Sequence, residues 1–162
     1  MIKFLVMDVD GTLTDGKIYM GDNGEKFKVF DIKDGYGIKD ILPQYGIIPV
    51  IITARNSKIL LNRCKELGIG YVFQNVREKQ VKLREIIEFH NKKYFTGYSL
   101  KDCAYIGDDI LDLQCMEPIK NAGGIVGCPK DAANEVVSLA NYVCTRQGGD
   151  GAVREFIEWI VR

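Results

Sequence analysis

Residues 3–14 read KFLVMDVDGTLT, an apolar, strand-forming run that stops abruptly at Asp8. Five further short apolar runs follow it, and stretches with apolar residues at helical spacing lie between most of them. Alternating strands and helices of this kind predict an α/β fold, with a doubly wound, mainly parallel sheet covered on both faces. The expected strands span residues 3–7, 47–52, 71–73, 103–106, 124–126 and 142–144, and the expected helices span 57–67, 78–91, 131–139 and 151–161.

One segment interrupts this alternation directly after the first strand. Lys17–Met20 and Lys26–Phe30 alternate in polarity on either side of the turn-forming residues Gly21–Gly24. This pattern predicts an inserted β-hairpin over residues 17–30. A hairpin cannot bury both of its faces alone, so we expect it to lean on the domain or on another subunit. No linker or repeat divides the chain, which predicts a single domain over residues 1–162.

The composition argues against several classes of function. The 162 residues include 22 basic and 22 acidic ones, so the formal charge is zero and nucleic acid is not an expected partner. The longest apolar runs, residues 46–53 and 156–161, are far below the roughly 20 residues that cross a bilayer, and no signal-peptide pattern opens the chain. Five cysteines without a CxxC pair predict reduced thiols and a cytoplasmic location.

Charged and hydroxyl side chains gather at the expected strand ends, where doubly wound sheets bind their ligands. Clustered carboxylates repel one another unless a cation lies between them, and an all-oxygen ligand set suits Mg²⁺. Strict strand alternation would turn Asp8 and Asp10 to opposite sides, unless Gly11 bends the chain. The residues at these ends are Asp8 and Asp10 after the first strand, Thr53 and Arg55 after the second, Arg77 and Lys79 after the third, and Asp108, Asp109 and Asp112 after the fourth.

These residue types together predict phosphoryl transfer. A carboxylate such as Asp8 can attack phosphorus and form an aspartyl-phosphate, and a second carboxyl at Asp10 can protonate the leaving oxygen and then activate water. Thr53 and Lys79 would hold the phosphoryl oxygens. Each residue alone has a structural explanation, because turns favour Asp and exposed helices carry Lys. Their joint order along the chain is what favours a catalytic site.

Four short patterns in this order resemble the motifs of the haloacid dehalogenase (HAD) superfamily of phosphatases. They are residues 8–14 (DVDGTLT), Thr53, Lys79 and residues 107–112 (GDDILD). Residues 34–38 (DGYGI), 51–55 (IITAR) and 148–155 (GGDGAVRE) extend the resemblance over nearly the whole chain. With them the chain is similar to the superfamily branch that hydrolyses 3-deoxy-D-manno-octulosonate 8-phosphate (Kdo 8-phosphate).

The resemblance implies a Rossmann-like fold and a Mg²⁺-dependent phosphomonoesterase without a cap domain, which serves lipopolysaccharide precursor synthesis. It makes Asp8 the nucleophile and Asp10 the general acid and base. The implied metal ligands are Asp8, the Asp10 carbonyl and Asp108, with Asp109 and Asp112 as nearby supports. The implied assembly is a homotetramer in which the hairpin packs between subunits, so that a neighbouring subunit closes the site.

The expected substrate is a small sugar-acid phosphate. Arg55 can pair with its carboxylate in bidentate fashion, or instead bond to main chain at a helix start. Arginine at this position favours Kdo 8-phosphate over the related nine-carbon acid 9-phosphates, whose phosphatases tend to carry Glu. Lys33 is a further candidate for substrate binding, with a solvated surface role as its alternative, and Gly11 and Thr12 of the first motif complete the expected set.

A phospho-acceptor receiver domain is the alternative from another functional class. Receivers also place an aspartyl acceptor, a Thr and a Lys on a doubly wound sheet. They carry the acidic pair before the acceptor, however, whereas here the acceptor candidate Asp8 is on the first strand and the acidic pair follows Lys79. This order disfavours the receiver.

Overall fold

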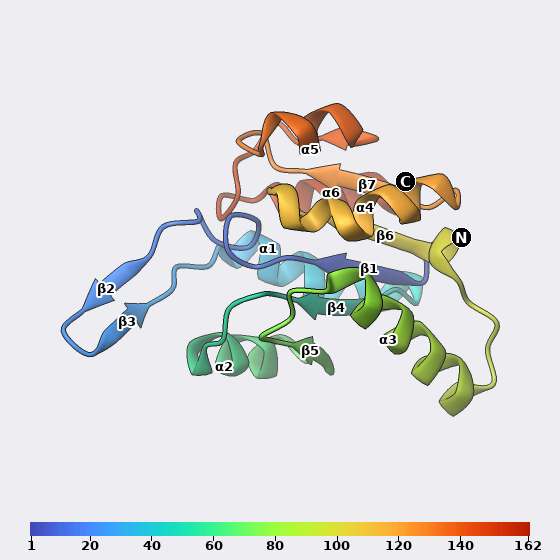
Figure 1. Ribbon diagram of the computed structural model, residues 1–162, viewed down its shortest axis with the longest axis horizontal. Coiled ribbons are helices and arrows are strands. Elements are labelled where there is room, and N and C mark those ends of the chain that lie inside the picture. Colours follow the sequence, from blue (N-terminus) through green and yellow to red (C-terminus); the bar gives the residue numbers. More distant parts are fainter.

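The computed structural model describes residues 1–162, and its centre is a six-stranded sheet with the order β5-β4-β1-β6-β7-β8 (Figure 1). Every pair of neighbouring strands in it is parallel, as the sequence predicts. The strands are β1 (Phe4–Met7), β4 (Ile48–Ile52), β5 (Tyr71–Phe73), β6 (Cys103–Ile106), β7 (Ile125–Cys128) and β8 (Tyr142–Val143). β1 lies in the middle, where Phe4 pairs with Ile48 on one side and Cys103 on the other.

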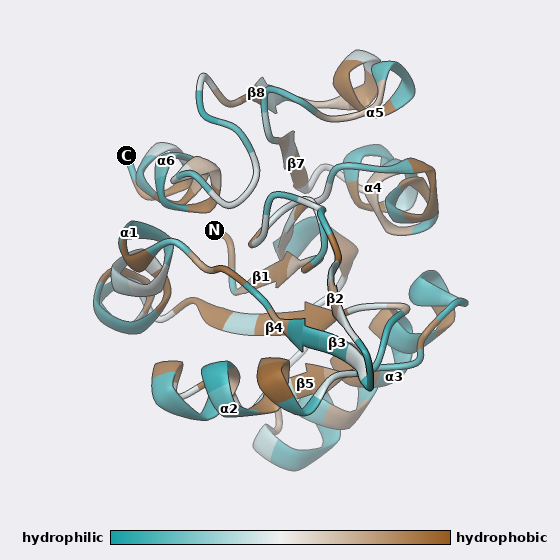
Figure 2. Ribbon diagram, turned by 90° about the vertical axis from the view of Figure 1, so that its left-hand side faces the viewer, coloured by the Kyte–Doolittle hydropathy of each residue, from teal (hydrophilic) through white to brown (hydrophobic).

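Helices cover both faces of this sheet (Figure 2), which confirms the predicted Rossmann-like α/β fold. Successive residues of β1 contribute alternately to two apolar clusters, because side chains of a strand point to opposite faces. One cluster includes buried side chains of α2 (Lys58–Leu67) and α6 (Ala152–Ile160), beside α1 (Ile32–Tyr36). The other includes α3 (Lys79–Tyr94), α4 (Leu113–Asn121) and α5 (Asn134–Leu139).

Two of these helices, α1 and α4, were not predicted from the sequence. α1 contains Asp34 and Gly35, residues typical of turns, and it continues into a π-helical turn η1 (Gly37–Ile41) and a 3₁₀ turn η2 (Leu42–Tyr45). α4 carries Pro118 in its interior, which argues against a helix by local rules. Burial of Cys115, Met116 and Ile119 against the sheet outweighs that local cost.

The hairpin is present but shorter than expected. It consists of β2 (Tyr19–Gly21) and β3 (Gly24–Phe27), joined by a two-residue turn, and the register shifts between Tyr19 and Met20. Gly24 has a φ of 108°, which L-residues with a side chain rarely adopt. The hairpin projects from the end of the sheet toward which β1 points (Figure 1). It is therefore at the edge where the predicted site residues gather.

The five cysteines are free and buried, in agreement with the prediction of reduced thiols. None of the helices combines the length and the apolar character that crossing a bilayer requires.

Candidate active site

Three carboxylates converge at the carboxyl ends of β1 and β6. Asp8, Asp108 and Asp112 each offer an oxygen atom, and these atoms lie within 4.8 Å of one another. Asp8 directly follows β1, and its N–H donates to the Ile106 carbonyl at 3.1 Å, which continues the ladder between β1 and β6. The Asp112 carboxylate accepts from the N–H groups of Asp108 and Asp109 at 3.0 and 3.1 Å. The turn after β6 thus folds back on its own Asp112.

Gly11 and Thr12 connect the first motif to this carboxylate group. Gly11 has a φ of 98°, and a β-carbon at this position would collide with the Asp108 carboxylate. Only glycine therefore lets the segment approach so closely. The Thr12 hydroxyl donates to Asp108 Oδ1 at 2.9 Å and fixes that carboxylate. Gly11 and Thr12 thus fix the position of the Asp108 carboxylate.

Lys79, the first residue of α3, is buried between two of the acids. Its Nζ lies 2.7 Å from Asp8 Oδ1 and 2.8 Å from Asp112 Oδ1. Only 2% of the side chain is exposed, and a buried ammonium needs such partners. The Tyr105 hydroxyl donates to the same Asp112 oxygen at 2.6 Å. Asp112 is therefore the anchor that holds Lys79 beside Asp8.

Burial shifts the pKa values of this group. Loss of solvent raises the pKa of Asp8 well above its usual range, and the charges of Asp112 and Asp108 raise it further against the opposing effect of Lys79. Burial and the charge of Asp112 raise the pKa of Asp108 to about 7. Burial alone would lower the pKa of Lys79, but Asp8 and Asp112 outweigh it and raise that pKa. Accumulated negative charge of this kind is what a divalent cation relieves.

Asp10 stands apart from the three converging carboxylates. Its Oδ1 lies 2.6 Å from Nζ of Lys28, a residue just beyond β3. Glu25 accepts from the same Nζ at 3.1 Å and also lies 3.4 Å from the guanidinium of Arg55. The hairpin of this chain thus reaches back to its own first motif and to the end of β4.

The remaining predicted residues are not all brought together. Thr53 is buried at the end of β4, and its hydroxyl makes no hydrogen bond within the chain. Asp109 is exposed, and its carboxylate caps the following turn by accepting from the Ile110 N–H. Lys33 is exposed on α1 and lines a groove with Arg146 and Arg154, away from the carboxylates. Asp112, expected as a support near the metal ligands, lies in the group and accepts from Lys79 and Tyr105.

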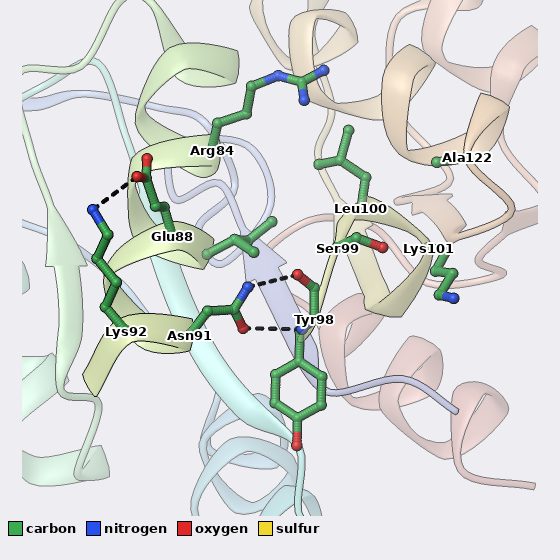
Figure 3. Close-up of a pocket in the computed structure, with 10 residues that line it drawn as sticks. Arg84, Glu88, Asn91, Lys92, Tyr98, Ser99, Leu100, Lys101 and Ala122 are labelled. Atoms are coloured by element: carbon green, nitrogen blue, oxygen red, sulfur yellow. Dashed lines mark hydrogen bonds and ion pairs between the residues drawn. The ribbon is translucent and has the colours of Figure 1, made fainter. Parts of the chain in front are cut away.

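Another cleft, of about 500 Å³, lies between α3 and the turn η3 (Leu100–Asp102) that precedes β6 (Figure 3). Asn91 closes it from α3 by hydrogen bonds to the Tyr98 backbone. This cleft is at the amino end of β6, whereas the carboxylates lie at the carboxyl end. None of the predicted site residues lines it.

Sequence reasoning missed the contributions of Glu25, Lys28 and Tyr105. One signal was available for Glu25 and Lys28. These opposite charges lie three residues apart, shortly after an acid-rich motif, and could have indicated an ion pair. No local pattern marks Tyr105, because it is an internal residue of an apolar strand.

No protein-family model matches the chain. Among curated proteins, it is 37% identical over 160 residues to the 3-deoxy-D-manno-octulosonate 8-phosphate phosphatase KdsC of Escherichia coli K12, an alignment that covers 99% of this chain and 79% of that protein. The KdsC protein of Yersinia pestis is 36% identical over 160 residues, with 99% and 80% covered.

Solved structures of similarly named proteins share the fold. A 3-deoxy-D-manno-octulosonate 8-phosphate phosphatase from Yersinia pestis superposes with a TM-score of 0.87 at 37% identity, covering 99% of this chain and 80% of its own. The same enzyme from Moraxella catarrhalis, in complex with a magnesium ion, a phosphate ion and Kdo, gives a TM-score of 0.86 at 38% identity over 99% and 86%. A cobalt-bound form from Haemophilus influenzae gives 0.87 at 35% identity over 99% and 87%.

Proposed function

We propose that this chain, which belongs to the family of Kdo 8-phosphate phosphatases within the HAD superfamily, hydrolyses Kdo 8-phosphate to Kdo and inorganic phosphate. Membership makes it a hydrolase of phosphoric monoesters and decides against the receiver hypothesis. The observation that carries the proposal is the group formed by Asp8, Asp108 and Asp112 with Lys79 inserted between two of them. A nucleophile, a place for a cation and a fixed positive charge thus meet at one sheet edge.

Magnesium is the proposed cofactor. The three carboxylates form an all-oxygen set, and their mutual repulsion and raised pKa values are what a divalent cation would relieve. The Asp8 and Asp108 carboxylates and the Asp10 carbonyl would hold the ion, and Asp112, whose oxygens already accept from Lys79, Tyr105 and the N–H groups of Asp108 and Asp109, would support them. The relative from Moraxella catarrhalis carries magnesium, which supports this choice. When bound, the ion supplies positive charge that offsets the charge of the phosphoryl oxygens.

In the first step of the proposed reaction, a carboxylate oxygen of Asp8 attacks phosphorus. The bond between phosphorus and the sugar oxygen breaks, and that oxygen takes the electron pair and a proton from Asp10. The Lys79 ammonium, 2.7 Å from Asp8, and the free Thr53 hydroxyl would hold phosphoryl oxygens as charge develops. The products are free Kdo and an aspartyl-phosphate on Asp8.

In the second step, water attacks the phosphorus of the aspartyl-phosphate. Asp10, now deprotonated, takes a proton from this water, and the bond between phosphorus and the Asp8 oxygen breaks. Inorganic phosphate leaves, and both carboxyl groups return to their initial state.

Arg55 is the proposed recognition group for the carboxylate of the sugar acid. It lies just past β4, and its guanidinium is held by Glu25 in the free chain. A planar, permanently charged fork matches a carboxylate in bidentate fashion. The relative whose structure contains Kdo and phosphate supports Kdo 8-phosphate over a nine-carbon acid 9-phosphate.

Assembly through the hairpin is part of the same proposal. Ile18, Met20, Phe27 and Val29 are all exposed in the isolated chain. Apolar side chains grouped on a projecting element are typical of a protein interface. We therefore infer that residues 1–162 act as one phosphatase domain and that residues 17–30 pack between subunits of a homotetramer. The five free cysteines fit a reducing compartment such as the cytoplasm, where lipopolysaccharide precursors are made.

One assay tests the proposed reaction. Phosphate release is measured with and without Mg²⁺ over a panel of sugar and sugar-acid phosphates that includes Kdo 8-phosphate and a nine-carbon acid 9-phosphate. We expect the highest kcat/KM for Kdo 8-phosphate and loss of turnover with EDTA. A higher kcat/KM for the nine-carbon ester would transfer the assignment to that substrate, and metal-independent turnover would contradict the mechanism.

A further inference from the structure

Lys28 is an unusual residue for a projecting hairpin, because its side chain is only 4% exposed. Lysines are almost never buried to this degree unless their charge is paired. Lys26, two residues earlier on the same hairpin, is exposed and makes no ion pair. The burial of Lys28 is therefore a property of its position rather than of the hairpin in general.

The partners of Lys28 are two carboxylates from different parts of the chain. Asp10 lies 2.6 Å away on the catalytic loop after β1, and Glu25 lies 3.1 Å away on β3. Asp10 has no other side-chain partner in the structure, whereas Asp8 is held by Lys79. The orientation of the Asp10 carboxylate thus depends on Lys28, and the place of Lys28 depends on Glu25.

We propose that Lys28 is a positioning residue, which holds the Asp10 carboxyl group in line with the leaving oxygen, and that Glu25 keeps Lys28 in place. This inference rests on the proposed function, since it assigns Asp10 the proton that the sugar oxygen receives. A carboxyl group transfers a proton efficiently only from a fixed geometry. The hairpin therefore contributes to catalysis within its own subunit.

The leaving group distinguishes this role from a structural one. A sugar alkoxide is a poor leaving group and needs the proton from Asp10, whereas p-nitrophenolate is stable without one. The parameter kcat/KM covers the steps up to the first irreversible one, which is departure of the alcohol, so it is not affected by the later attack of water. Loss of Lys28 should therefore affect kcat/KM for the two esters unequally.

The experiment measures kcat/KM with Mg²⁺ for Kdo 8-phosphate, for an alkyl phosphate without a carboxylate and for p-nitrophenyl phosphate in the wild type, Lys28→Met and Lys28→Arg. We expect Lys28→Met to lower the value for both alkyl esters about 10- to 100-fold and that for the aryl ester about threefold at most. Lys28→Arg, which keeps a cation, should restore most of the difference. Lys26→Met is the matched control and should leave all of these values at the wild-type level.

Equal losses on the alkyl and aryl esters would overturn the proposal, because Lys28 would then act on the phosphoryl group or only stabilise the fold. A loss confined to Kdo 8-phosphate would overturn it too, because it would arise through Glu25 and Arg55. If Lys28→Met lacks a native circular dichroism spectrum, Lys28→Gln takes its place and must show the same selective loss, and its absence overturns the proposal. A wild type that prefers another alkyl phosphate refutes only the substrate, and that ester then takes the place of Kdo 8-phosphate. A wild type inactive on every ester would refute both proposals.

Discussion

Asp34 provides a quantitative test of the electrostatics of this fold. It lies in α1 with 2% of its surface exposed, and its Oδ1 accepts from the Arg154 N–H at 2.8 Å. Its Oδ2 is buried without any partner. Burial, together with the charges of Asp31 and Asp150, raises the pKa of this carboxyl from 3.8 to about 7 against the hydrogen bonds it accepts. The charged form is therefore costly in the folded protein.

The sign of the effect follows from proton binding. Between pH 4 and 7 the folded chain retains a proton on Asp34 that the unfolded chain has lost, so stability falls as pH rises through this window. Asp34→Asn keeps the shape and an acceptor for the Arg154 N–H but cannot ionise. Between pH 5 and 8, the free energy of unfolding of the variant should rise relative to wild type by about 2 to 3 kcal/mol.

Urea denaturation followed by circular dichroism at several pH values measures this difference. Comparing the variant with wild type at each pH cancels the contributions of Asp8 and Asp108, which titrate in both proteins. Asp40→Asn, at an exposed position, is the matched control and should show little change with pH. A constant difference between Asp34→Asn and wild type from pH 5 to 8 would refute the reasoning, whatever its absolute value.

Three further predictions concern activity and assembly. Asp8→Asn should abolish Mg²⁺-dependent phosphate release with an unchanged circular dichroism spectrum, and retained turnover would refute the nucleophile assignment. Arg55→Ala should raise KM about 10- to 100-fold for Kdo 8-phosphate and little for p-nitrophenyl phosphate, because only the former offers a carboxylate. Equal changes in KM would remove Arg55 from recognition. Replacing exposed Ile18 and Met20 by lysine should shift the mass in light scattering from tetramer toward monomer, and an unchanged mass would exclude the hairpin from the interface.

Most of the fold was predictable because its signals are local. Each strand of the sheet is a short apolar run, and the bounds of α2 are indicated by the Ser57 cap at its start and Gly68 at its end. The helices that were missed, α1 and α4, form against local preference. Packing of α4 on β6 and β7 compensates for Pro118, and Gly35 of α1 lies against Arg63 and Leu67 of α2; no window of sequence contains these contacts.

The site was predictable to the extent that strand ends determine it. Asp8 and Asp108 follow neighbouring parallel strands, so topology alone brings them to one edge. Asp112 was expected as a support, but its partners Lys79 and Tyr105 could be identified only from the structure. The pairing of Asp10 with Lys28 depends on how the hairpin folds back, which periodicity does not encode.

The amino-acid sequence by itself determined the parallel sheet, the presence of acids and a lysine at its carboxyl edge, and the hairpin that follows the first strand. It did so because these features follow from residue type and spacing over a few positions. Only the tertiary structure decided that Asp8, Asp108 and Asp112 converge beside Lys79 and that Asp10 pairs separately with Lys28. Those choices depend on distances between residues as far apart as Asp8 and Lys79, and such distances exist only once the chain has packed.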